Sequence, residues 1–296
     1  MLTLKIADLS QQYKSDSWIL DNLSVTLNSG LSVLIGPNGA GKTTFLRLLA
    51  GVLQPSAGKI LFDGKDISHD YNHYKQRIGY LPQEFGFYPD MTGRTFLNYM
   101  ARLKGLPPEL YPERVEEMAE HVGIKFIWDR TIDSWSSGLK RRLGLAQALL
   151  NDPDILILDE PMVGLDPEEK LFYWNYLYKL SRDRIVILSS NTLADFITLA
   201  DGVVLLVNGK VRFHGQVQEF TELVNDKVWT VEIPLEQGKM FAEKWAISAI
   251  SFSENGYYIR IVSDTIPDFP GVCPAEPCIE DAYTHLVRQK YTSSKE

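Results

Sequence analysis

The sequence predicts an α/β fold with a smaller unit at its C-terminal end. Two apolar runs, at 155–158 and 185–188, are typical of strands that a parallel sheet buries on both faces. Segments with the apolar spacing of helices lie before and between them. The chain has 296 residues, 45% of them hydrophobic, enough for one large domain with an appendage or for two domains. We expect domains at 1–217 and 218–296.

The N-terminal segment combines strand patterns with a motif. Its first 35 residues alternate apolar and polar positions, which predicts half-buried strands of an antiparallel sheet. A short apolar strand at 31–35 and a helix at 45–50 flank Gly36-Pro37-Asn38-Gly39-Ala40-Gly41-Lys42-Thr43-Thr44. This stretch fits the phosphate-loop pattern G-x-x-x-x-G-K-[ST] at every fixed position. The sequence therefore predicts a P-loop NTPase core that binds a nucleoside triphosphate.

The residue types of this loop suit a bound polyanion. Gly36, Gly39 and Gly41 allow backbone conformations and close approaches that a side chain would block, so successive amides can face the phosphates. Lys42 adds positive charge near the β and γ phosphates, and the Thr43 hydroxyl is placed to bind Mg²⁺. Two further loop residues are candidates for nucleotide contact, Asn38 and Thr44.

The middle of the chain predicts a helical insertion. After strand patterns at 58–64 and 78–82, residues from about 89 to 150 carry three segments with helical spacing, at 96–103, 113–122 and 139–150, and a break at Pro107-Pro108. A further helix, at 168–180, lies between the two buried apolar strands.

The C-terminal part predicts a small α+β accessory domain. The core is expected to close near Gly215, after a hairpin whose turn is Asn208-Gly209. Residues from about 226 to 266 alternate again as strands, and a last helix is predicted from about 279 to 288. Two cysteines, Cys273 and Cys278, are expected to be free thiols, because no further metal ligands lie near them in the sequence.

Charge and hydropathy narrow the class of protein. The 30 basic and 38 acidic residues give a net charge of −8, which argues against a broad nucleic-acid surface or a polybasic membrane anchor. No apolar run reaches the roughly 18 residues of a membrane span, and the first residues lack a signal-peptide core. We expect a cytosolic, soluble chain without a nucleic-acid partner.

A second group of polar residues follows the buried strand at 155–158. Asp159 and Glu160 stand at its carboxyl end, where ligands bind in open α/β sheets. Asp159 would hold Mg²⁺, directly or through water, and Glu160 would polarise the water that attacks the γ phosphate. Without the phosphate loop, the same pair could cap the next turn.

Together these motifs resemble the ATPase subunit of an ATP-binding cassette (ABC) transporter, over residues 1 to about 215. The family signature, usually leucine-serine-glycine-glycine-glutamine, is matched in altered form by Trp135-Ser136-Ser137-Gly138-Leu139. The resemblance implies that Ser136 and Gly138 contact ATP bound to an opposite subunit, so that catalysis requires a head-to-tail dimer. Without the resemblance, the segment is only a helix cap.

The resemblance also implies roles for single residues. Gln83 matches the glutamine that senses Mg²⁺ and the membrane partner, and Asp166 matches a cross-subunit contact in the loop after the acids. Their alternatives are a surface loop and a proline-ended turn. Tyr13 matches the aromatic residue that stacks on adenine, and Trp18 is a second candidate that we favour less.

One position departs from the family. Asn191 stands where members usually have a histidine that touches the γ phosphate. An amide donates a hydrogen bond but neither titrates nor carries charge. We expect hydrolysis through Glu160 that is slower than in members with histidine. The opposing hypothesis is a subunit that barely turns over and relies on a partner chain with an intact site.

The resulting hypothesis is an ATP-hydrolysing subunit that powers a membrane exporter. Residues 103–105 resemble export-type systems whose membrane protein is encoded separately, and residues 277–283 resemble them weakly. By the resemblance, the aromatic stretch 85–99 would bind the membrane subunit and hold this chain at the inner face of the membrane. The alternative is that its rings pack inside the core of the helical insertion. A homodimer is expected and a heterodimer stays open. A regulatory subunit with weak turnover and a soluble non-transport ABC ATPase are the alternative functions.

Overall fold

The structure is a computed structural model that describes residues 1–13, 17–191, 199–254 and 256–292. A six-stranded sheet of order β10-β9-β3-β8-β7-β6 lies at its centre. The neighbours from β9 to β6 pair in parallel, and β10 joins β9 as an antiparallel hairpin. The strands are β3 (Gly30–Ile35), β6 (Ile78–Leu81), β7 (Ile155–Leu158), β8 (Ile185–Ser190), β9 (Gly202–Val207) and β10 (Lys210–Gln216).

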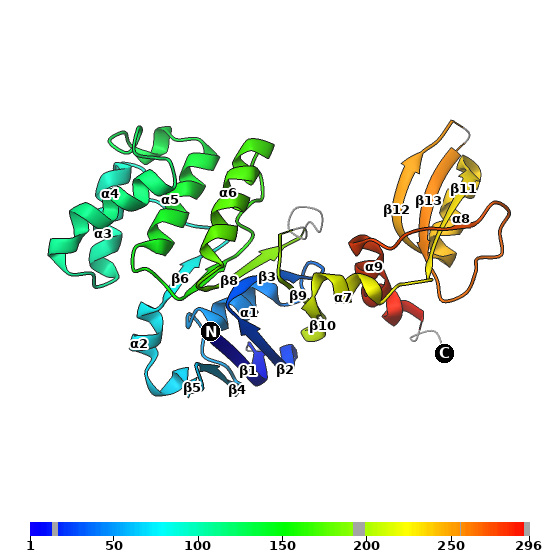
Figure 1. Cartoon of the computed structure of the whole chain (residues 1–296), viewed down its shortest axis with the longest axis horizontal. Helices are drawn as coiled ribbons and strands as arrows, with labels where there is room; N and C mark the ends of the chain where they lie inside the picture. Colours follow the sequence, from blue (N-terminus) through cyan, green and yellow to red (C-terminus); the bar gives the residue numbers. More distant parts are fainter. Residues whose placement is uncertain (14–16, 192–198, 255, 293–296) are drawn as a thin grey trace.

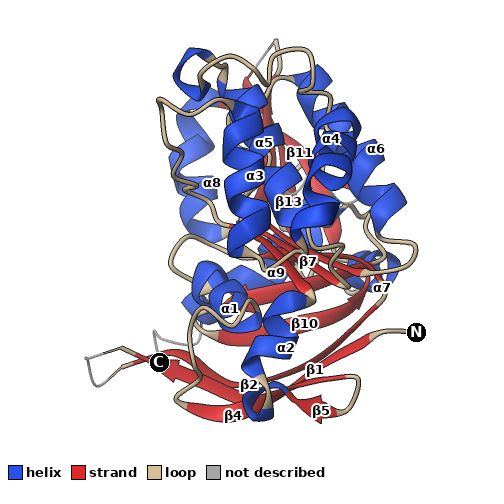
Figure 2. Ribbon diagram, turned by 90° about the vertical axis from the view of Figure 1, so that its left-hand side faces the viewer, coloured by secondary structure: helices blue, strands red, loops and turns tan. Residues whose placement is uncertain are grey.

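Both faces of this sheet are covered, which explains the continuous apolar runs of its strands. Along β7, Leu156 and Leu158 belong to one hydrophobic core, while Ile155 and Ile157 belong to another. Successive strand residues point to opposite faces, so a central strand such as β7 is apolar at every position and fills both cores. Figure 2 shows helices α3 to α6 on one side of the sheet and β1, β2, β4 and β5 on the other.

The predicted antiparallel sheet is present and has the order β2-β1-β4-β5. Its strands are β1 (Thr3–Gln12), β2 (Trp18–Asn28), β4 (Ala57–Phe62) and β5 (Lys65–Asp66). The helices on this side of the molecule are α1 (Lys42–Leu49) and α2 (Tyr71–Gln76). The P-loop NTPase fold class with an antiparallel β subdomain is confirmed.

The helical insertion contains the expected helices, but each begins two or three residues before its predicted start. The structure has α3 (Gly93–Leu103), α4 (Tyr111–His121) and α5 (Ser137–Leu149), followed by α6 (Pro167–Leu180). The side chain of Thr92 caps α3 by accepting a hydrogen bond from the Thr95 amide at 3.2 Å. A periodic pattern is recognised from large apolar side chains, so the first turns of α3 and α5, which consist of glycine and polar residues, are missed. Four 3₁₀ turns complete the helical structure in the described ranges: Ile67–His69, Pro108–Leu110, Ile132–Ser134 and Leu235–Gln237.

The C-terminal part forms a third sheet, of order β12-β13-β11-β14, at one end of the molecule (Figure 1). Its elements are β11 (Val228–Pro234), α8 (Gly238–Lys244), β12 (Ala246–Phe252), β13 (Gly256–Val262), β14 (Cys273–Pro274) and α9 (Ile279–Thr292), with α7 (Val217–Glu222) leading into it. Neither α7 nor α8 was predicted, because six or seven residues are too few for a periodic signal.

Both cysteines of the chain lie in this part. Cys273 and Cys278 are free thiols in the described part of the chain, as predicted. Among the described helices, none combines the length and apolar character needed to span a membrane.

A buried ion pair fastens α9 to β13. Asp281 is fully buried and accepts hydrogen bonds from the Arg260 guanidinium at 2.7–2.9 Å and from the Cys278 amide at 2.8 Å. Burial acts to raise the pKa of Asp281, but the hydrogen bonds from Arg260, Ser248 and Cys278 outweigh it and hold this pKa below the ordinary value. The pair therefore stabilises the C-terminal sheet only while Asp281 is ionised.

We expect Arg260→Met to lower the free energy of opening of the β13 amides by about 3 kcal/mol at pH 7, because it leaves a buried carboxylate without its partner. A carboxyl group whose pKa is lowered in the folded state contributes stability above its unfolded pKa, and this stability is lost as the pH falls through the folded pKa. The difference in stability between the parent and Arg260→Met should therefore shrink below about pH 4. Hydrogen exchange measures this quantity. The control is Asp264→Asn, which breaks the exposed pair of Lys227 and Asp264 and should cost below about 1 kcal/mol. Equal effects of the two variants would contradict the prediction.

Candidate active site

The phosphate loop joins the end of β3 to the start of α1, and close backbone contacts shape it. A Cβ on Gly36 would lie 2.1 Å from the carbonyl oxygen of Leu206, so only glycine fits there. Gly41 precedes α1 with φ +102°, a left-handed conformation, and a Cβ on it would meet Leu20 at 2.6 Å. The loop amides and the first turn of α1 are thereby placed for an anion.

The lysine of the loop is buried and hydrogen-bonded to the loop backbone. Lys42 is 7% exposed, and its ammonium group donates hydrogen bonds to the carbonyl oxygens of Gly36 at 2.7 Å and Pro37 at 3.2 Å. Burial lowers the pKa of Lys42, while the charges of Glu160 and Asp159 act to raise it. The site thus has positive charge opposite two carboxylates.

A serine at the end of β8 orients both acids that follow β7. Ser189 donates its hydroxyl proton to Asp159 Oδ1 at 2.6 Å and accepts a hydrogen bond from the Glu160 amide at 2.8 Å. The second carboxylate oxygen of Asp159 is buried and has no hydrogen-bond partner in the described part of the protein. A buried oxygen in this state suits a cation.

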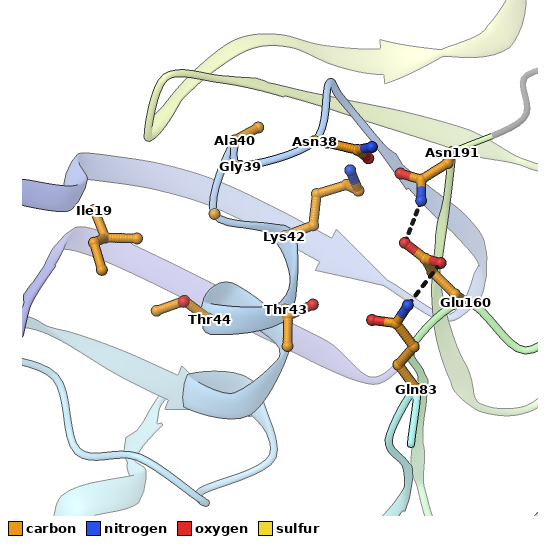
Figure 3. A pocket seen from close by; sticks show the side chains of 11 residues that line it. Ile19, Asn38, Gly39, Ala40, Lys42, Thr43, Thr44, Gln83, Glu160 and Asn191 are labelled. Carbon is orange, nitrogen blue, oxygen red and sulfur yellow. Dashed lines mark hydrogen bonds between the residues drawn. The ribbon is translucent and has the colours of Figure 1, made fainter. Parts of the chain in front are cut away.

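The Glu160 carboxylate is held by two amide side chains (Figure 3). Gln83 Nε2 donates to Glu160 Oε2 at 3.1 Å, and Asn191 Nδ2 donates to Glu160 Oε1. Glu160 also has φ +48°, which is unfavourable for a residue with a Cβ. Residues from three strand ends, after β6, β7 and β8, thus converge on one carboxylate.

These groups line one pocket of about 570 Å³. It brings together nine of the predicted site residues and two others: Asn38, Gly39, Gly41, Lys42, Thr43, Thr44, Gln83, Glu160 and Asn191, with Ile19 and Ala40. Ile19 comes from β2 and was missed, because its strand pattern indicated burial rather than a pocket wall. Ser189 was also missed as a site residue. Its signal was the pair of serines that ends the otherwise apolar strand β8.

Both aromatic candidates for adenine lie outside the pocket lining. Tyr13 is 45% exposed and Trp18 is 48% exposed, and neither is among the described residues that line the pocket. Residues 14–16 between them lie outside the described ranges.

The three candidates for contacts with an opposite subunit, Ser136, Gly138 and Asp166, stand at helix starts. Ser136 accepts a hydrogen bond from the Leu139 amide at 3.3 Å and caps α5, while Asp166 accepts from the Glu169 amide at 2.9 Å and caps α6. A Cβ on Gly138 would lie 3.2 Å from Glu169, so the two helix starts are close. The capping alternative is thus observed for Ser136, and Asp166 has a capping role of its own.

The aromatic stretch after Gln83 divides between core and surface. Phe85 and Phe87 pack on Phe96 with ring centroids 5.9 and 5.7 Å apart, whereas Tyr88 is 51% exposed. A groove of about 550 Å³ lies here. It is lined by Leu81, Pro82, Gln83, Glu84, Phe85, Gly86, Phe87, Ser137, Lys140 and Arg141.

A phosphate loop facing an ordered acid pair defines a P-loop nucleoside triphosphatase. The comparisons with known proteins agree: a family model described as ABC transporter matches residues 20–163. YxlF of Bacillus subtilis strain 168, an uncharacterized ABC transporter ATP-binding protein, is 37% identical over 250 residues, covering 84% of this chain and 83% of its own. The chain belongs to the ATP-binding subunits of ABC transporters, which are ATPases, and the resemblance in the sequence is confirmed.

Two more relatives are informative. Nod factor export ATP-binding protein I of Burkholderia lata is 35% identical over 197 residues, covering 66% of this chain and 65% of its own. The solved structure of an ATP binding subunit of an ABC transporter has a TM-score of 0.68 at 25% identity, covering 75% of this chain and 93% of its own.

We expect Tyr13→Ala to weaken binding of a non-hydrolysable ATP analogue about tenfold, because stacking on an aromatic ring contributes about 1–3 kcal/mol per base. Trp18→Ala should change the affinity less than twofold. Tripolyphosphate, which lacks the base, should bind equally to both variants and the parent in calorimetric titrations. If Trp18→Ala has the larger effect, Trp18 is the adenine contact.

Proposed function

We propose that this subunit hydrolyses Mg²⁺-bound ATP in the pocket between Lys42 and Glu160 and uses the reaction to drive a membrane exporter. One observation carries the proposal: the Glu160 carboxylate is held by Gln83 and Asn191 in the pocket that the phosphate loop lines. A general base must be positioned before its proton affinity matters, and two amide donors supply that positioning.

The loop and the acids divide the chemistry. The loop amides and Lys42 bind the β and γ phosphates. Glu160 accepts a hydrogen bond from the attacking water and orients it in line with the γ phosphate, and the amide of Asn191 donates near that phosphate. Thr43, Asp159 and Gln83 would hold Mg²⁺ through oxygen atoms, and the ion would neutralise phosphate charge. The unpartnered Asp159 oxygen fits this assignment.

Mg²⁺ would also need phosphate oxygens as ligands. Over the described ranges, no group of three or more His, Cys, Asp or Glu side chains could hold a metal by itself. The protein would supply three oxygen ligands, from a hydroxyl, an amide and one carboxylate, and the nucleotide would complete the coordination. This ligand set matches the usual Mg²⁺ site of nucleotide enzymes.

We further propose a head-to-tail dimer that forms on ATP. Ser136, Gly138 and Asp166 lie at the starts of α5 and α6 and not in the lining of the pocket of their own chain. The amides of a helix start and a serine hydroxyl favour an anion, so an opposite subunit can use them to close the site. A homodimer is the simplest case because it uses the same surfaces twice, and a heterodimer is the alternative.

The groove beside Gln83 is the proposed docking place of the membrane subunit, which would hold this chain at the inner face of the cell membrane. It combines phenylalanine rings with polar groups and lies next to a residue that touches Glu160. Export is supported by the similarity to the Nod factor export ATP-binding protein I of Burkholderia lata. The C-terminal sheet supports the predicted separate domain at 218–296, because within the described ranges β11 to β14 pair with one another and with no strand of the other two sheets.

Asn191 favours a second candidate, a regulatory subunit with weak turnover. Its neutral amide cannot supply the charge of a protonated histidine beside the γ phosphate. Retention of Glu160 and its two hydrogen bonds supports turnover.

We expect Glu160→Gln to abolish ATP turnover of the purified chain while ATP binding stays within about threefold, because the amide cannot accept the water proton. ATP-dependent dimers should accumulate and be visible by size-exclusion chromatography. Lys42→Ala is the contrasting variant and should lose binding itself. Tight binding without turnover in both parent and Glu160→Gln would instead favour the regulatory candidate.

We expect Asn191→His to raise kcat several-fold, because an imidazole can carry positive charge toward the γ phosphate. Steady-state turnover between pH 6 and 8 measures this, and the gain should be larger at lower pH, where more imidazole is protonated. Asn191→Ala is the control and should lower kcat, since Glu160 loses a donor. An unchanged or reduced rate in Asn191→His would show that Asn191 does not limit the chemistry.

A further inference from the structure

The backbone carbonyl of Glu160 accepts a hydrogen bond from a side chain that has no role in the chemistry proposed above. Arg141, on α5, donates from Nη1 to the carbonyl oxygen of Glu160 at 3.1 Å. Its Nη2 donates to the carbonyl oxygen of Val163 at 3.4 Å. The planar fork of one guanidinium thus bridges both ends of the turn that follows β7.

This turn needs external support. Glu160 has a left-handed φ of +48° and precedes Pro161, which narrows its conformations further. The turn's own hydrogen bonds are long, with Val163 N to Glu160 O at 3.4 Å and Leu165 N to Met162 O at 3.3 Å. Ser189 holds the Glu160 amide from β8, so Arg141 supplies the opposing hold on the carbonyl.

Arg141 is also the link to the helix that carries the signature. Ser136 caps α5, and Arg141 lies just over one turn into that helix. Its side chain lines the groove beside Gln83 as well. The Arg141 side chain therefore connects α5 and the wall of this groove to the Glu160 carbonyl.

We propose that Arg141 is a positioning residue for hydrolysis: by its two hydrogen bonds to the 160–163 turn it couples the position of α5 to the backbone of Glu160. The described hydrogen bonds of Arg141 go to two backbone carbonyl oxygens, and Arg141 is not among the described residues that line the phosphate-loop pocket. The inference rests on the proposed role of Glu160.

The test uses the full chain and three substitutions. Arg141→Gln removes the charged fork, Arg141→Lys keeps the charge without the fork, and Lys140→Gln removes a neighbouring charge. Lys140 is the matched control, because it lines the same groove from the same helix but donates to the Asp133 carbonyl oxygen at 3.2 Å. Steady-state turnover gives kcat and KM, titration with a non-hydrolysable ATP analogue gives Kd, and thermal unfolding reports the folded fraction.

We expect Arg141→Gln to lower kcat about tenfold with Kd within about twofold, because a charge-assisted hydrogen bond to the turn is lost while the phosphate loop is intact. Arg141→Lys should recover part of the rate, and Lys140→Gln should stay within about twofold of the parent. The coupling is wrong if Arg141→Gln turns over like the parent, if Lys140→Gln loses as much, or if the loss only follows Kd or the folded fraction.

The Glu160→Gln variant distinguishes a failure of this inference from a failure of the proposed function. If Glu160→Gln still hydrolyses ATP, the proposed function fails and the positioning role fails with it. If Glu160→Gln is inactive and Arg141→Gln is fully active, only the positioning role is overturned.

Discussion

The parallel register of β3, β8, β7 and β6 sets the place of the polar groups that follow these strands in the nucleotide pocket. Ile35 pairs with Ser190, so the phosphate loop leaves its strand beside the residue that precedes Asn191. Leu158 pairs with Leu188, so the acid pair begins beside Ser189. Because parallel strands end at the same edge, a shift of one residue would turn the side chains at that edge to the opposite face and separate the carboxylates from their donors.

That register produces an electrostatic balance. Lys42 is desolvated, which disfavours its charge, and the nearby carboxylates partly compensate. The balance changes when a triphosphate binds, since the phosphates bring negative charge to Lys42 and to the same edge as Asp159 and Glu160. A cation beside the buried Asp159 oxygen would reduce that repulsion. The held position of Glu160 then keeps its carboxylate ordered in a field that would otherwise push it from the phosphates.

The sequence predicted those site residues that belong to a local motif, and missed those that reach the site from a distant part of the chain. The phosphate loop and the acid pair are local patterns next to strands, so their places followed from the motif and the strand pattern. Ser189 and Arg141 act across 30 and 19 positions, respectively, and no spacing rule connects them to the acids. Strand β12 was not separated from its neighbours, because it is a sheet edge whose last four residues are all exposed. Without a buried face, period-two alternation has no physical cause.

The caps of α5 and α6 show how a structural role and a proposed contact can belong to one residue. The Ser136 hydroxyl accepts the Leu139 amide through a lone pair and keeps its proton for donation to an anion. Asp166 uses Oδ1 for its cap and retains Oδ2. Arg142, paired with Glu169 at 2.8 Å, ties the two helices together near these caps. A surface built in this way is already ordered before a second subunit meets it, so closure on ATP would cost little conformational entropy there.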